Sequence, residues 1–327
     1  MGMSATVRVG TCSWADETLT KVWYPKGVRS GEARIRHYAE RFGTVEANST
    51  YYRLPDAELV GNWAERTPQG FTMHVKAFGL MTRHPVKVEA LPEDLREVMP
   101  VDEKGRVDRP PRELRAEIFR RFSRAVEPLR QTGKLGGILL QFPSYVVYKP
   151  ASLDYIEWAA DQLRGDDVLI EFRHRSWLDD ENREQTLSFL ESRGLTYVIV
   201  DAPKTDARNL VPTVVGKTST TAYVRFHGRN ASTWNKRTGS AAERFDYLYS
   251  EQELEEWVEP LKELALDTES VYAMFNNNGR SEMPSTGLDG IEPEEIAGDP
   301  AKGEVAQAPA NALMLRRALQ AAGVPVS

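Results

Sequence analysis

The sequence predicts an α/β fold, a single (β/α)8 barrel of the TIM type, in which eight parallel strands alternate with helices. Eight short apolar runs, rich in β-branched or aromatic residues, are separated by segments with helical periodicity. Parallel strands need such crossover connections. The first run is followed by Cys12-Ser13-Trp14, not by the glycine-rich turn typical of a doubly wound sheet. Eight strand–helix repeats also fit a chain of 327 residues.

The predicted strands are of ordinary length and follow one another along the whole chain. In order they are Val7–Cys12, Thr44–Asn48, Phe71–Lys76, Leu135–Phe142, Val168–Phe172, Leu195–Asp201, Ala222–His227 and Val271–Asn276.

Amphipathic segments between these runs predict the helices. In Glu113–Arg130 apolar residues recur at spacings of three and four. A similar face runs over 254–264, and a closing helix is predicted around 313–319. Weaker patterns that fit helices are Ile35–Phe42, Ala57–Arg66, Leu153–Leu163 and Glu184–Ser192.

We expect one barrel domain over residues 1–327, with insertions at 79–112, 228–250 and 277–305. These three connections are longer than usual loops, and each follows a predicted strand. In a barrel, all three would therefore lie at the C-terminal mouth. The second is locally basic and the third is acidic, whereas the first is balanced in charge.

The composition excludes several classes of protein. The chain has 41% hydrophobic and 28% charged residues and a net charge of −6, which is typical of a globular protein. A single cysteine, Cys12, excludes an internal disulfide and a cysteine-based metal site. Without a long apolar stretch or an apolar leader, we expect a cytoplasmic protein with no membrane partner. No P-loop, GxSxG or HExxH motif occurs.

Polar side chains gather at the ends of the predicted strands. Residues two apart on a strand share a face, and here the alternate positions are mostly apolar. The apolar set would pack against the helices, so the polar set would point into the barrel near its mouth, where barrel active sites lie. The polar set is Glu46, Asn48, His74, Lys76, Glu171, Arg173, Asp201, Arg225, His227 and Asn276.

These charges must pair with one another or with a ligand, because an unpaired buried charge costs several kcal/mol. A self-satisfied ion-pair plug is one alternative. We favour a site, because apolar layers normally fill a barrel core. The cations Lys76, Arg173 and Arg225 suit a small anionic ligand, such as one bearing phosphate. The candidate acid–base groups are Glu46, Glu171, His227 and Asp201, and Asn48 and Asn276 would orient substrate or water.

This pattern does not choose among hydrolysis, elimination and isomerisation. Two other functions are also compatible with it. The protein could instead be a non-catalytic barrel that binds a nucleotide or nucleic acid through the basic 229–244 loop. Glu46 and Glu171 could also act as the carboxylate pair of a glycosidase.

Three further chemistries would depend on one or a few of these residues. One Mg²⁺ or Mn²⁺ could sit on Glu46, Glu171 or Asp201. Cys12 with Ser13 could be a nucleophile pair, although a lone cysteine at a strand end is more often buried. A Schiff base on Lys76 would need a depressed pKa, which the neighbouring sequence does not predict.

Several motifs resemble the YecE-like domain-of-unknown-function family, number seventy-two in its series. They run in order along the chain: GTCSW (10–14), VEANSTYYRLP (45–55), FTMHVK (71–76), LGGILLQFP (135–143), IEFRHRSW (170–177), YVRFHGRN (223–230) and FNNN (275–278). The resemblance implies a (β/α)8 barrel and no established reaction. It adds Ser13, Trp14, Tyr52 and Gln141 to the strand-end residues as positions of the expected site.

Overall fold

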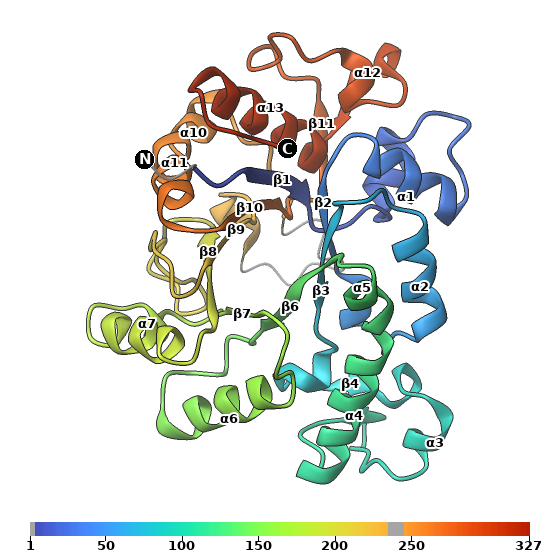
Figure 1. The fold of residues 1–327 in the computed structure, drawn as a ribbon, viewed down its shortest axis with the longest axis vertical. Helices are drawn as coiled ribbons and strands as arrows, with labels where there is room; N and C mark the ends of the chain where they lie inside the picture. The colour runs from blue at the N-terminus through green and yellow to red at the C-terminus, as the bar shows by residue number, and fades with distance from the viewer. Residues whose placement is uncertain (1–3, 235–244) are drawn as a thin grey trace.

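A closed barrel of eight parallel strands forms the centre of the molecule (Figure 1). We describe it from a computed structural model, in residues 4–234 and 245–327. Around the barrel the strands follow the order β1-β10-β9-β8-β7-β6-β3-β2, so strands that are consecutive in the chain are also neighbours in space. The pairs are all parallel. The fold is therefore the predicted (β/α)8 barrel.

All eight predicted strands are present, and their ends differ from the prediction by no more than one residue. They are β1 (Val7–Thr11), β2 (Thr44–Ala47), β3 (Thr72–Lys76), β6 (Leu135–Gln141), β7 (Val168–Glu171), β8 (Thr196–Asp201), β9 (Thr221–Phe226) and β10 (Ser270–Phe275).

Helices surround the barrel and cover the outer faces of its strands (Figure 1). They are α1 (Gly31–Ala39), α2 (Ala57–Glu65), α4 (Arg112–Ala125), α5 (Glu127–Gln131), α6 (Pro150–Asp161), α7 (Arg183–Glu191), α10 (Glu251–Glu255), α11 (Val258–Asp267) and α13 (Gln307–Ala321).

One predicted helix is divided in two. The periodicity of Glu113–Arg130 predicts a continuous helix, but α4 ends at Ala125 and α5 begins at Glu127. Pro128 explains the break, because proline has no N–H to donate and its ring clashes with the carbonyl group four residues earlier. Pro260, the third residue of α11 (Val258–Asp267), likewise lies shortly after the boundary between α10 (Glu251–Glu255) and α11.

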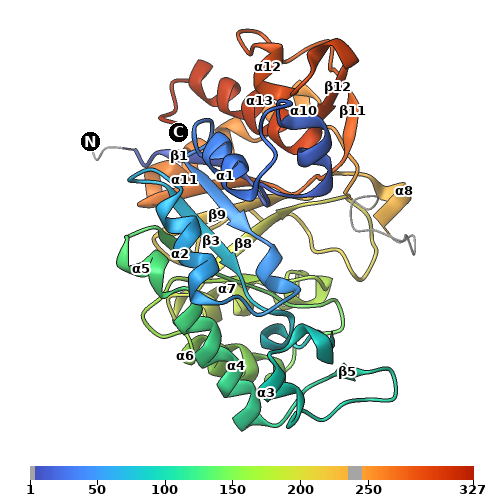
Figure 2. The ribbon, with the colours of Figure 1, turned by 90° about the vertical axis from the view of Figure 1, so that its right-hand side faces the viewer.

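The long connections carry small elements of their own. Residues 79–112 contain η3 (Gly79–Thr82), β4 (Val86–Lys87), η4 (Val88–Ala90), α3 (Glu93–Arg96) and β5 (Arg106–Val107), with β4 and β5 paired antiparallel. Residues 277–305 contain β11 (Arg280–Glu282), α12 (Pro293–Ile296), η6 (Pro300–Lys302) and the start of β12 (Glu304–Ala306). Figure 2 shows α3 and α12 at opposite ends of the molecule. Between them, α8 (Ala231–Trp234) follows β9.

An aromatic layer fills the barrel below its mouth. The buried ring of His74 lies 4.7 Å from the ring of Tyr223 and 4.3 Å from that of Tyr272, edge to face in both cases. Burial lowers the pKa of His74 to about 3, so this imidazole is neutral. No helix within residues 4–234 and 245–327 is long and apolar enough to cross a membrane.

Candidate active site at the barrel mouth

Arg225 of β9 lies at the centre of a fully buried charge cluster. Its Nη2 donates to Oε1 of Glu46 at 2.6 Å, and its Nη1 donates to Oε2 of Glu171. The hydroxyl of Tyr223 donates to Oε2 of Glu46 at 2.9 Å. All four side chains are fully buried. Strands β2, β7 and β9 bring these residues together, as the shared strand face predicts.

This Arg225 cluster is an ion-pair network at neutral pH. Burial opposes the charge of Glu171, but the guanidinium groups of Arg173 and Arg225 outweigh it and hold its pKa well below 4.5. A carboxylate held in this state is a poor proton donor. The geometry therefore gives no support to Glu171 as a general acid, including as the acid of a glycosidase. The self-satisfied ion-pair plug, one of the two alternatives that the sequence leaves open, therefore describes Glu46, Glu171 and Arg225.

Above the Arg225 cluster, Arg173 and His227 form a second polar layer. Arg173 contacts Oε1 of Glu171 through its Nε, and its Nη2 lies 3.0 Å from Nε2 of His227. The other ring nitrogen of His227 lies 2.9 Å from Nδ2 of Asn276. Burial and then the charge of Arg173 lower the pKa of His227 well below 6.5. The imidazole is therefore neutral and held between its neighbours.

Lys76, the last residue of β3, differs from the other cations of the mouth. Its Nζ lies 4.5 Å from the centre of the Tyr51 ring and has no ion pair or hydrogen bond within the described part of the chain. Burial, followed by the charge of Arg225, lowers the pKa of Lys76 to about 8. The sequence alone did not predict this depression, because the fold supplies both causes.

Two adjoining cavities open above these layers, with volumes of about 310 and 330 Å³. Both are lined by Tyr52, Lys76, Phe245 and Asn276. The remaining described walls of the first are Cys12, Ser13, Trp14, Ala15, Asp16, Asn48, Ser49 and Asn278. Those of the second are Tyr51, His84, Gln141, Pro143, Ser144, Arg173, Asn209 and Trp234. The mouth is thus polar and aromatic, with two cations and a single carboxylate among these residues.

The residues added by the family resemblance all line the cavities. Ser13 and Trp14 follow β1, and the Trp14 ring packs edge-on against Trp63 at 5.2 Å. Tyr52 is exposed at the rim, and Gln141 ends β6. Asn48 lies on the same wall, where its Nδ2 donates to the carbonyl oxygen of Cys12 at 2.6 Å.

Cys12 also lines the first cavity but is fully buried. Burial and the charge of Glu46 raise the pKa of its thiol well above 9. At neutral pH it is a protonated thiol, and Oγ of Ser13 accepts a hydrogen bond from the backbone N–H of Ala15. The nucleophile-pair hypothesis therefore has no support from this geometry.

Asp201 does not join the Arg225 cluster, although it ends β8 as predicted. Its carboxylate accepts hydrogen bonds from Arg229 at 2.7 Å, from the Tyr249 hydroxyl at 2.8 Å and from the Trp257 indole at 2.9 Å. The side chain is 1% exposed. Asp201 is thus a structural anchor for the segment that follows β9, and the expectation of an acid–base role at the mouth is not met.

The same pairing bears on nucleic-acid binding. Arg229, the first basic residue of the 229–244 loop, is held by Asp201 and also donates to Glu256 at 2.8 Å. The guanidinium group of Arg229 is therefore bound by two carboxylates of this chain, where nucleic-acid binding would need it to contact a phosphate. Lys236, Arg237 and Arg244 lie outside the described residues.

Donors also surround the three carboxylates considered for a metal ion. Glu46 and Glu171 face Arg225, and Asp201 faces Arg229. Within residues 4–234 and 245–327, no group of three His, Cys, Asp or Glu side chains is arranged to hold a metal ion.

Sequence reasoning missed several wall residues. Asp16 lies in the loop after β1, and burial raises its pKa to about 6. His84 comes from the 79–112 connection, where burial and the charges of Lys76 and Arg173 lower its pKa to about 3. Tyr51 and Trp234 lie in the segments that follow β2 and β9. No periodicity marks any of them, because they follow the strands.

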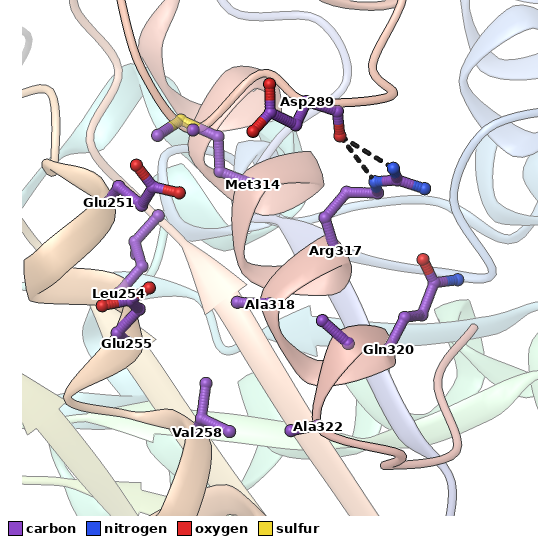
Figure 3. Close-up of a pocket in the computed structure, with 12 residues that line it drawn as sticks. Glu251, Leu254, Glu255, Val258, Asp289, Met314, Arg317, Ala318, Gln320 and Ala322 are labelled. Atoms are coloured by element: carbon purple, nitrogen blue, oxygen red, sulfur yellow. Dashed lines mark hydrogen bonds between the residues drawn. The ribbon is translucent and has the colours of Figure 1, made fainter.

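A larger cavity, of about 780 Å³, lies on the outside of the barrel between α10, α11 and α13 (Figure 3). Its walls carry Glu251, Glu255, Asp289 and Arg317, and Arg317 donates to the backbone carbonyl of Asp289 at 2.7 Å. The close-up shows Glu251 and Glu255 on one side of the cavity and Arg317 on the other, bonded to Asp289. Convergent polar groups are found at the barrel mouth instead.

Comparison with known proteins bears out the resemblance. Residues 8–289 match the model of a family described as "Protein of unknown function DUF72". The chain belongs to the DUF72 family. It is 29% identical over 290 residues to the UPF0759 protein YunF of Bacillus subtilis, covering 88% of this chain and 94% of that one. It is 28% identical over 229 residues to the UPF0759 protein YecE of Escherichia coli K12, covering 65% and 74%.

Solved structures of DUF72 proteins share the barrel. The DUF72 protein of Thermotoga maritima superposes with a TM-score of 0.70 at 28% identity, over 96% of this chain and 99% of that one. A DUF72 protein of Enterococcus faecalis gives 0.72 at 22% identity, over 96% of both chains. The names of these relatives state no substrate.

Proposed function

We propose that the barrel mouth binds a small anionic ligand bearing phosphate or carboxylate, and that the protein is an enzyme acting on it. One observation carries the proposal: Lys76 and Arg173 face cavities whose described walls hold one carboxylate, that of Asp16. Below them, Arg173 and Arg225 balance the two buried carboxylates, and the positive charge of protonated Lys76 has no carboxylate partner within 4.0 Å among the described residues. An anion would balance it.

The neutral walls favour a ligand with hydroxyl groups as well as charge. Amide side chains of Asn48, Gln141 and Asn276 can donate and accept hydrogen bonds. Aromatic residues line the same cavities, and the guanidinium carbon of Arg173 lies 5.9 Å from the centre of the Trp234 ring. Aromatic faces beside cations suit a sugar ring or a base. The favoured ligand is therefore a phosphorylated, hydroxyl-bearing molecule small enough for these cavities.

The groups that titrate near neutral pH on these walls are Lys76 and Asp16, with pKa values of about 8 and 6. Such values suit proton transfer near pH 7. In the proposed enzyme they replace Glu171 and His227 as proton carriers. Glu171 would instead hold Arg173 in place, and His227 would hold Asn276.

A thermal-shift experiment tests the anion site. Ribose 5-phosphate at about 100 times its dissociation constant is expected to stabilise the protein by about 2.7 kcal/mol, or about 4 °C in Tm. Arg173→Ala is expected to remove most of this shift. Ribose without phosphate serves as the ligand control.

The matched control variant is Arg175→Ala. Arg175 lies two residues further on, where it donates to the Asp206 carbonyl at 2.8 Å and lines neither cavity. It is expected to keep the full phosphate-dependent shift. Equal shifts in both variants, or none in the unaltered protein with inorganic phosphate, pyrophosphate, ribose 5-phosphate and pyruvate, would contradict the anion site.

A further inference from the structure

The surroundings of Lys76 resemble those of a reactive amine and differ from those of a cation held in a structural ion pair. It lines both mouth cavities, so a ligand in either can reach its side chain. Its Nζ has no carboxylate partner within 4.0 Å among the described residues, unlike Arg173 and Arg225. The contact at its side is the face of the Tyr51 ring, 4.5 Å away.

Lys134 offers a comparison within the same molecule. Its buried Nζ donates to the carbonyl oxygens of Ala64 and Thr67, each at 2.6 Å. Such an amine is fixed by its acceptors and lines neither mouth cavity. Lys76 has no comparable acceptors in the described part of the chain, and it lines both cavities in which a ligand would lie.

We infer that Lys76 is a nucleophile that forms an imine with a carbonyl carbon of the anionic ligand. The inference rests on the proposed function, because Arg173 would hold the phosphate or carboxylate group beside the amine. It narrows the substrate class to small aldehydes, ketones or keto acids that carry such a group. The chemistry is that of an amine-dependent lyase or isomerase.

The charge environment favours the neutral amine that this reaction needs. Burial and the charge of Arg225 lower the pKa of Lys76 to about 8, against the pull of Glu46 and Glu171. At pH 7.5 about a quarter of such amines are neutral, compared with about one in a thousand for an ordinary lysine. Arg225 already pairs with both carboxylates, which limits how far they stabilise the ammonium form.

The reaction balances without any oxidant or reductant. The amine lone pair attacks the carbonyl carbon, a C–N bond forms, and a proton moves from nitrogen to oxygen to give a carbinolamine. The hydroxyl group then takes up a proton and leaves as water, and loss of the remaining N–H proton gives a neutral imine. Asp16 can carry these protons: it lines the first cavity with Lys76, and its Oδ2 has no partner among the described residues.

Reductive trapping tests the inference. The full-length protein is incubated with glyceraldehyde 3-phosphate, and separately with pyruvate, in the presence of sodium cyanoborohydride. Intact mass and peptide mapping then measure the adduct at each lysine. With at least one probe we expect a single early adduct at Lys76, forming at least tenfold faster than at the exposed Lys87. Its rate is expected to rise with pH to a midpoint near 8.

Two variants serve as controls. Lys76→Arg keeps a cation beside Tyr51 but has no primary amine, so the early adduct should be lost. Lys87→Arg should leave it unchanged. Trapping at Lys76 no faster than at Lys87 would overturn the inference.

The phosphate-dependent thermal shift separates the two proposals. If phosphate compounds stabilise the protein but Lys76 forms no early adduct, the anion site stands and the imine inference fails. If neither is seen, both fail.

Discussion

Replacing Arg225 with methionine is expected to lower the free energy of unfolding by about 3–5 kcal/mol. The change removes the only guanidinium group that contacts both Glu46 and Glu171 among the described residues, and all three side chains are fully buried. Two carboxylates would then lie in the barrel with less compensation. Urea denaturation followed by tryptophan fluorescence measures the loss.

A compensating variant separates charge from packing. In Glu46→Gln/Glu171→Gln/Arg225→Met the three charges of the Arg225 cluster are gone, the side-chain volumes are nearly kept, and Arg173 alone loses its carboxylate partner, so we expect part of the lost stability to return. If the triple variant is as unstable as Arg225→Met, the loss comes from packing and the ion-pair account of the Arg225 cluster is wrong.

Asp201→Ala is expected to cost about 3–5 kcal/mol without weakening anion binding. It leaves Arg229, Tyr249 and Trp257 without their shared acceptor, and the last two are buried. The free energy of unfolding is measured in urea. Binding of ribose 5-phosphate is measured by titration calorimetry at a temperature below the Tm of the variant.

Asp206→Ala is the matched control, because Asp206 is a fully exposed carboxylate that also lies beside an arginine, Arg175. It should change the stability by less than about 1 kcal/mol. A stable Asp201→Ala protein that has lost phosphate binding would instead place Asp201 in the ligand site.

The barrel and the buried part of the site follow from sequence periodicity. A strand exposes alternate residues on one face, so polar residues at alternate positions of β2, β7 and β9 must meet inside a closed barrel. This is why Glu46, Glu171 and Arg225 could be placed together before their contacts were known.

Periodicity does not identify a side chain's partners or its protonation state. Asp201 occupies a strand end like Glu171, but Arg229 and Trp257, from the segments after β9, take its carboxylate away from the mouth. His84 reaches the cavity only through the folding of the 79–112 connection. The depressed pKa of Lys76 depends on burial and on Arg225, which is 149 positions away in the chain.

The most direct test of the anion site is a crystal structure of the protein with tungstate, whose anomalous scattering locates a phosphate-like oxyanion. We expect the ion at the barrel mouth, within hydrogen-bonding distance of Lys76 and the guanidinium group of Arg173, and we expect it to be absent in Arg173→Ala. Tungstate bound only elsewhere on the molecule, with the mouth empty, would contradict the account.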